Sequence, residues 1–166
     1  MTEKLQTLRD SAAMRWIALL LLAFAMFCSY VFMDILSPIK DLMQSTRGWD
    51  SSAFGTMQGS ETFLNVFVFF LIFAGIILDK MGIRFTGLLS ASLMVIGAAI
   101  KFYAVSDSFA GSALETTLSE WGIMGLPGSA MLACLGFMIF GCGCEMAGTT
   151  VSKAIAKWFK GKEMAM

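Results

Sequence analysis

Four long apolar stretches constrain this chain more than any other feature of its sequence. A membrane-spanning helix needs about 20 mostly apolar residues, and stretches that meet this requirement occupy approximately residues 16–37, 57–79, 85–104 and 129–151. Hydrophobic residues make up 57% of the chain and charged residues 14%, which is too little charge to cover a water-soluble domain of this size. We therefore predict an all-α fold, in which residues 1–166 form a single polytopic membrane domain with four transmembrane helices.

The Lys and Arg residues between these stretches predict how the helices cross the membrane. Two of them, Lys40 and Arg47, lie in the first connector, and the third connector, about residues 105–128, has none. Nine others flank the opposite ends of the spans: Lys4, Arg9, Arg15, Lys80, Arg84, Lys153, Lys157, Lys160 and Lys162. Positively charged segments stay in the cytoplasm. Both termini are therefore expected there, with residues 105–128 as an outer loop that contains a short amphipathic turn around residues 114–121.

The composition also excludes several classes of function. The chain has no histidine, which is the commonest metal ligand and the usual general base, and no nucleophile–base pair supports an enzyme. Lys+Arg and Asp+Glu balance at 12 each, so the chain as a whole has no electrostatic signature for nucleic acid. We predict no enzymatic activity, no metal site, no cofactor and no nucleic-acid partner, and the lipid bilayer as the surroundings of the helices.

The connector between the second and third predicted spans combines charge with glycine. It reads Gly75-Ile76-Ile77-Leu78-Asp79-Lys80-Met81-Gly82-Ile83-Arg84, which indicates a helix end, a tight glycine turn and the start of the next helix. An aspartate at the C-terminal end of a helix faces the negative end of the macrodipole. Asp79 therefore needs a positive partner, either Lys80, Arg84 or the N-terminus of a neighbouring helix. The alternative interpretation is that these are ordinary interfacial charges of a helical hairpin.

This connector resembles the G-x-L-x-D-[RK]-x-G-x-[RK] signature of the major facilitator superfamily, with Ile77 in place of the leucine. Residues 30–38, 61–83 and 140–163 are similar to the branch that contains the lysosomal dipeptide carrier and its bacterial relatives. The chain differs at Phe137, where many members carry an arginine in the fourth span. The resemblance implies a bacterial inner-membrane location and a cytoplasmic conformational latch formed by Gly75, Asp79, Lys80, Gly82 and Arg84.

Charged and polar side chains within the predicted spans mark a candidate pathway. A carboxylate in the hydrocarbon core costs at least about 2.5 kcal/mol on insertion scales, so each one requires a reason. Glu145 is predicted about 7 Å to the cytoplasmic side of the midplane, as a substrate-amine or proton site; the alternative is a carboxylate paired with a basic residue of a helix outside this chain. Asn65 and Asp34 are further candidates for the pathway. Glu61 and Lys101 are expected near the outer surface, where Lys101 pairs with Asp34 or Glu61 as an ion pair or gate.

These observations favour a secondary active or facilitative transporter of small organic solutes that works by alternating access. The resemblance implies dipeptides as solutes and a fold of twelve spans, of which these four match the first part. We therefore expect an incomplete N-terminal half, whose partners are the remaining transporter helices or a second copy of the chain. Two alternatives stay open: a complete four-helix protein that dimerises as a small exporter-like proton antiporter, and a non-transporting membrane subunit.

Overall fold

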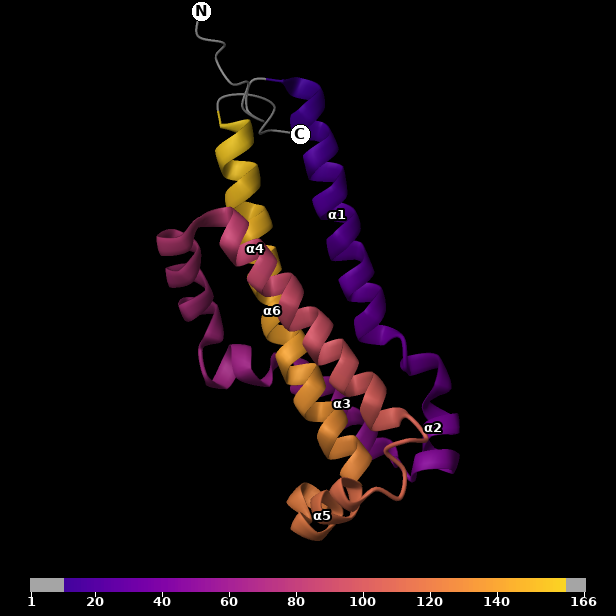
Figure 1. Cartoon of the computed structure of the whole chain (residues 1–166). Helices are drawn as coiled ribbons and strands as arrows, with labels where there is room; N and C mark the ends of the chain where they lie inside the picture. The colour runs from indigo at the N-terminus through magenta and orange to yellow at the C-terminus, as the bar shows by residue number, and fades with distance from the viewer. Residues whose placement is uncertain (1–10, 161–166) are drawn as a thin grey trace, which may run out of the picture.

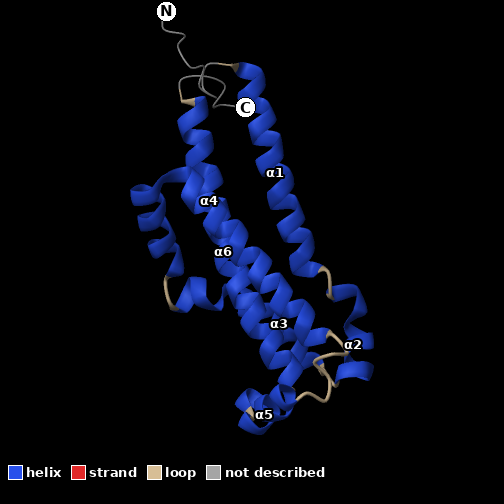
Figure 2. Ribbon diagram, in the orientation of Figure 1, coloured by secondary structure: helices blue, strands red, loops and turns tan. Residues whose placement is uncertain are grey.

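The computed structural model describes residues 11–160, and all regular structure within this range is helical (Figures 1 and 2). This confirms the predicted all-α class. The predicted cytoplasmic residues Lys4, Arg9 and Lys162 lie outside the described residues. The helices, in chain order, are α1 (Ala12–Asp34), η1 (Ser37–Ile39), α2 (Lys40–Arg47), α3 (Ser51–Phe67), α4 (Phe70–Val105), α5 (Ala113–Trp121), η2 (Ile123–Gly125) and α6 (Gly128–Phe159).

Three helical stretches are long and apolar enough to cross a membrane. They are Ala12–Arg47, Phe70–Val105 and Gly128–Phe159. At about 1.5 Å per residue, a helix needs about 20 residues to span the hydrocarbon core, and each of these stretches exceeds that length. The structure is thus compatible with a multi-pass membrane protein. The end of the molecule where α1 begins and α6 ends is called the terminal end below, and the opposite end, which holds α2 and α5, is called the loop end (Figure 1).

Short polar residues and glycines determine where several helices begin and end. The Asp50 carboxylate accepts a hydrogen bond from the backbone N–H of Ala53 at 2.7 Å and thereby caps the start of α3. Ser112 caps α5 in the same way. Gly48 and Gly122 end α2 and α5 with left-handed backbone conformations, which glycine adopts without steric cost. Helix α5 confirms the short amphipathic turn predicted within residues 105–128.

The predicted second span, residues 57–79, is not one continuous helix. Helix α3 ends at Phe67, and Phe69 adopts a left-handed conformation with φ 55° before α4 begins at Phe70. The first part of α4 then runs to Gly82, where φ 80° and ψ 172° turn the chain back. The first part of α4 is seen at the left of Figure 1. Hydropathy does not reveal the break because the apolar run of residues 66–73 continues through it.

Helices α4 and α6 form the centre of the molecule and cross at glycines. A Cβ atom added to Gly97 would overlap the backbone of Phe140, and one added to Gly136 would lie 2.8 Å from both the Gly97 carbonyl oxygen and the Lys101 amide nitrogen. No side chain fits at either position without separating the helices. This close backbone approach is the packing that small residues permit between membrane helices.

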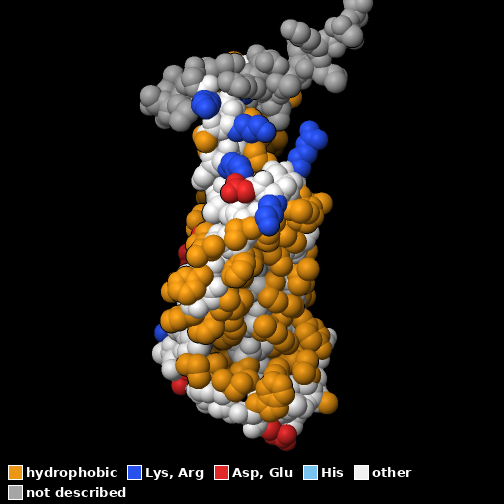
Figure 3. Space-filling view, turned by 90° about the vertical axis from the view of Figure 1, so that its left-hand side faces the viewer, with side chains coloured by type: hydrophobic (Ala, Val, Ile, Leu, Met, Phe, Trp, Pro, Cys, Tyr) orange, Lys and Arg blue, Asp and Glu red, His pale blue; other side chains and the backbone are white. Residues whose placement is uncertain are grey.

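Helix α1 contacts α6 through aromatic pairs near its two ends. The rings of Trp16 and Phe159 are 5.6 Å apart, and those of Phe32 and Phe140 are 4.8 Å apart. Most of the other large apolar side chains of α1 are exposed. Apolar side chains also cover the middle of the face shown in Figure 3, with most of the visible Lys and Arg toward the terminal end. Such a surface suits contact with lipid or with further helices.

Candidate functional site

Two half-buried carboxylates, on helices α3 and α6, lie within electrostatic range of each other. Gly141 of α6 lies directly against Glu61 of α3, so closely that an added Cβ atom would overlap the Glu61 carbonyl group. Glu145 follows one turn later on α6, and its carboxylate is close enough to Glu61 to interact electrostatically. Both carboxylates also lie within electrostatic range of the Tyr30 hydroxyl group on α1. Glu61 and Glu145 are called the acidic pair below.

Glu61 packs against the middle of α6. The sequence predicts Glu61 near the outer surface, four residues into a span that begins at residue 57. Helix α3 instead begins at Ser51, so Glu61 lies about 15 Å along it. Its neighbour Gly141 is near the middle of the 32-residue helix α6. Glu61 therefore lies within electrostatic range of Glu145 and, among the described residues, forms no ion pair with Lys101.

Asn65 extends the polar surface of α3 by one turn beyond Glu61. Its side chain is 6% exposed, and neither its oxygen nor its nitrogen has a hydrogen-bond partner among residues 11–160. The Glu61 Oε1 atom is also buried and unpartnered within that range. A buried polar group without a hydrogen bond costs about 1–3 kcal/mol. A polar group from a solute, or from elsewhere in the protein, would offset this cost.

Lys101 of α4 is buried against aromatic rings rather than paired with an acid. Its side chain is 2% exposed, and its Nζ lies 3.7 Å from the ring centroid of Phe137 and 5.1 Å from that of Phe32. Among the described residues, Lys101 Nζ makes no hydrogen bond and no ion pair. These contacts are cation–π interactions, in which the negative face of the ring attracts the ammonium group.

The expected ion pair of Lys101 with Asp34 or Glu61 is therefore wrong. Gln58 of α3 donates a hydrogen bond to Asp34 Oδ1 at 3.0 Å, which fixes the Asp34 carboxylate at the exposed end of α1. Asp34 and Lys101 still interact electrostatically, but over more than the length of an ion pair. Glu61 is held away from Lys101 by its packing against Gly141.

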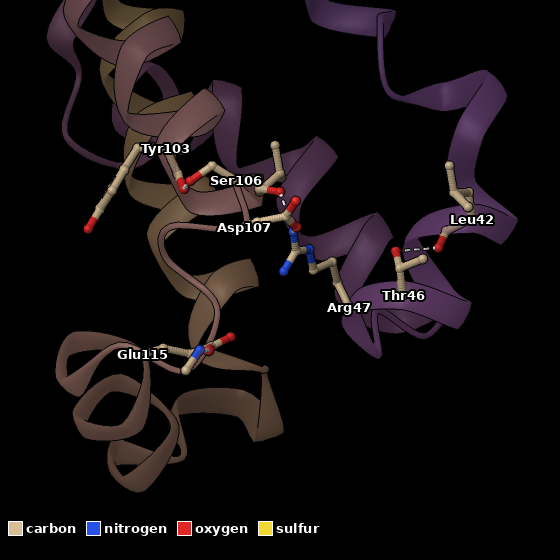
Figure 4. A network of polar contacts seen from close by, with 9 residues as sticks. Leu42, Thr46, Arg47, Tyr103, Ser106, Asp107 and Glu115 are labelled. Carbon is tan, nitrogen blue, oxygen red and sulfur yellow. Dashed lines mark hydrogen bonds and ion pairs between the residues drawn. The ribbon is translucent and has the colours of Figure 1, made fainter.

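An ion pair that the sequence analysis missed joins two connectors at the loop end (Figure 4). Arg47, the last residue of α2, donates to Asp107 Oδ1 at 2.6 Å and to the Val105 carbonyl oxygen at 2.9 Å. In the sequence, the only indication of this ion pair is that the first connector contains Lys and Arg residues, whereas the third contains acidic residues and no Lys or Arg. Their pairing ties the end of α2 to the end of α4.

At the terminal end, Asp79 has its positive partner on α6. Lys153 Nζ donates to Asp79 Oδ1 at 2.5 Å and to the Leu78 carbonyl oxygen at 3.3 Å. The expected partners Lys80 and Arg84 form no ion pair within residues 11–160. They follow Asp79 along the chain, and Gly82 turns the backbone between them, whereas α6 packs beside this turn. Gly82 supplies the predicted turn, while Gly75 has no neighbour close enough to require a glycine.

We expect the Asp79–Lys153 pair to contribute measurably but weakly to stability. Its side chains are 78% and 40% exposed, and exposed ion pairs contribute about 0.2–1 kcal/mol. A double-mutant cycle of Asp79→Asn and Lys153→Met, measured by the free energy of unfolding, is expected to give a coupling in that range. Lys80→Met is the matched control and should give no coupling with Asp79→Asn. A cycle in which Asp79 couples to Lys80 and not to Lys153 would contradict the observed pairing.

No protein-family model matches the chain, and no solved structure matches it significantly. The fold itself defines a broad class: an all-helical protein with helices long and apolar enough to cross a membrane. Its helices carry the half-buried acidic pair, the buried Lys101 and the buried Asn65, whose amide has no hydrogen-bond partner within residues 11–160.

Proposed function

We propose that the protein transports small organic solutes by alternating access, with Glu61, Asn65 and Glu145 lining the solute pathway. The observation that carries the proposal is that Glu61 and Glu145 lie within electrostatic range of each other, close to the buried Asn65 amide, which has no hydrogen-bond partner within residues 11–160. Ionisable residues inside a membrane protein are rare and generally mark substrate or ion pathways. Polar residues that served only to hold helices together would be expected to satisfy one another, and Asn65 has no such partner in the described part of the chain.

The chemistry of this group favours a solute that carries hydrogen-bond donors. Carboxylates accept hydrogen bonds and attract cations, and a buried amide both donates and accepts. A primary or secondary amine would satisfy the acidic pair, and a peptide or amide group would satisfy Asn65. The resemblance to the major facilitator superfamily supports the same assignment, since it implies a substrate-facing role for Glu145 and dipeptides as solutes.

The break between α3 and α4 supports motion close to the proposed pathway. It follows Asn65 by only three residues, and the left-handed conformation of Phe69 is a strained one that costs about 1–3 kcal/mol. Secondary transporters commonly place their binding sites where a membrane helix is interrupted. A change of the backbone at this break would move the first part of α4 relative to α3.

The proposed function includes four membrane crossings with both termini in the cytoplasm, the second crossing being made by α3 and the first part of α4 together. Two observations support this topology. The start of α1 and the end of α6 lie at the same end of the molecule (Figure 1), and most of the visible Lys and Arg side chains lie toward that end (Figure 3). Positively charged segments remain on the cytoplasmic side.

The topology predicts opposite accessibility for cysteines introduced at Ser112 and Arg84. In a Cys28→Ser background, Ser112→Cys should react with a membrane-impermeant maleimide in intact cells, because it caps α5 at the loop end. Arg84→Cys should react only after the membrane is permeabilised. The readout is the labelled fraction of the purified protein, and the background variant without an added cysteine is the control. Equal labelling of both sites in intact cells would contradict the topology.

The transport proposal is tested with proteoliposomes that contain the protein as its whole gene encodes it. They are incubated with a panel of labelled solutes: an amino acid, alanylalanine, a monosaccharide and an organic cation. Time-dependent uptake of at least one amine-bearing solute above protein-free liposomes is expected. Uptake of no solute on the panel would contradict the proposed function. Uptake of the monosaccharide alone would contradict the proposed role of the acidic pair.

A further inference from the structure

Lys101 is a buried ammonium group that forms no ion pair with the described residues. It is 2% exposed, and within residues 11–160 its Nζ has neither a hydrogen bond nor an ion pair. Burial of an ion is costly unless an opposite charge and hydrogen bonds compensate for the lost water. Cation–π contacts with Phe137 and Phe32 provide attraction but accept no conventional hydrogen bonds. The three N–H donors of the ammonium group therefore call for an acceptor that this part of the chain does not provide.

The backbone around Lys101 is held by the crossing of α4 and α6. Gly136 of α6 lies against the Lys101 amide nitrogen at the α4–α6 crossing, which holds this part of the two helices together. Phe137 follows Gly136 directly and contributes the nearer ring. The second ring, Phe32, comes from α1, a helix with few buried side chains. Displacement of α1 would therefore uncover the ammonium group and leave its position relative to α6 unchanged.

Asp34 is not the counter-ion of Lys101. Asp34 interacts with Lys101 electrostatically, yet its carboxylate is anchored by Gln58 on the exposed side of α1. The acidic pair lies further along α6: Phe137 precedes Gly141 by one turn and Glu145 by two. The levels of Lys101 and Glu145 thus differ by about 12 Å along the helix axis. Lys101 is therefore a positive group distinct from the acidic pair, buried between α1, α4 and α6.

We propose that Lys101, framed by Phe32 and Phe137, binds a carboxylate group of the transported solute. The inference rests on the proposed function and extends it, because it adds a negatively charged group to the chemistry of the solute. A carboxylate supplies the acceptors that the ammonium group lacks, and the two aromatic rings exclude water from the pair, which strengthens the attraction. Arrival of the solute accompanies displacement of α1, and its departure returns Lys101 to the rings.

The test compares alanylalanine with its C-terminal amide, which differs by loss of the carboxylate charge. Their binding to the purified protein is measured by calorimetry in wild type, Lys101→Met, Lys101→Arg and the exposed-lysine control Lys157→Met. We expect wild type and Lys157→Met to bind the acid at least tenfold more tightly than the amide. Lys101→Met should reduce this preference to less than threefold by weakening the acid alone, and Lys101→Arg should retain most of it. Melting temperatures verify that each variant is folded.

The outcomes separate this proposal from the transport proposal. A wild type that binds acid and amide equally, or a Lys101→Met variant that keeps the wild-type preference, would overturn the carboxylate site and leave the transport proposal in place. A second probe, sodium propionate against propionamide, tests Lys101 without an amine group. Lys101-dependent stabilisation by propionate alone, with no binding of either peptide, would support the carboxylate site and contradict the peptide-like solute. No effect of any probe would contradict both.

Discussion

Replacement of Gly136 by leucine is expected to prevent α4 and α6 from packing and to remove nearly all folded protein. A Cβ atom at this position would lie 2.8 Å from the Gly97 carbonyl oxygen and from the Lys101 amide nitrogen, and 3.0 Å from an Ile100 methyl group. The first two are backbone atoms of a helix, which cannot rotate aside as a side chain would. Overpacking in a core typically costs 1–3 kcal/mol, and a clash that separates two helices is expected to cost more than about 3 kcal/mol.

Gly148→Leu on the same helix is the matched control for this prediction. A Cβ atom there would meet only the terminal methyl group of Met26, at 3.9 Å, which is an ordinary contact with a flexible side chain. The measurement is the yield of monodisperse protein in detergent, followed by thermal unfolding. We expect Gly136→Leu to be lost and Gly148→Leu to resemble wild type. Equal yield and stability of the two variants would show that α4 and α6 do not cross at Gly97 and Gly136.

Glu145→Gln is expected to reduce solute uptake by about tenfold or more without unfolding the protein. A hydrogen bond to a charged group contributes about 1.5–3 kcal/mol, and 1.4 kcal/mol corresponds to a factor of ten in affinity. Glutamine keeps the size of the side chain and removes its charge, so the packing of α6 against α3 is preserved. The loss should appear in uptake at solute concentrations below saturation.

Glu120→Gln and Glu145→Asp complete the Glu145 experiment. Glu120 is an exposed acid of α5 at the loop end, so its replacement controls for the loss of one negative charge. Glu145→Asp keeps the charge and should retain more uptake than Glu145→Gln. Wild-type uptake by Glu145→Gln in folded protein would remove Glu145 from the pathway.

Local features of the fold could be predicted from the sequence because they depend on short segments. Long apolar runs specify helices that suit a membrane, and the charged glycine connector specifies a turn at Gly82. The break at Val68 and Phe69 could not be predicted, since the apolar run of residues 66–73 continues through it and neither residue is a helix breaker.

The partners of the charged residues could be predicted only in part. Asp79 was recognised as a carboxylate that needs a positive partner, but its partner Lys153 lies 74 positions away in the sequence. Arg47 and Asp107 are separated by 60 positions, and the rings beside Lys101 come from two other helices. Such pairs depend on how the helices pack, and charge type alone leaves several pairings possible for each residue.

The central claim, that the acidic pair belongs to a solute pathway, is tested most directly by counterflow in proteoliposomes. Liposomes that contain the protein are loaded with unlabelled alanylalanine and diluted into a trace of the labelled compound. Exchange through a carrier predicts transient accumulation of label with wild type, strongly reduced accumulation with Glu145→Gln, and wild-type accumulation with Glu120→Gln. Equal accumulation of label by wild type, by Glu145→Gln and by liposomes without protein would contradict it.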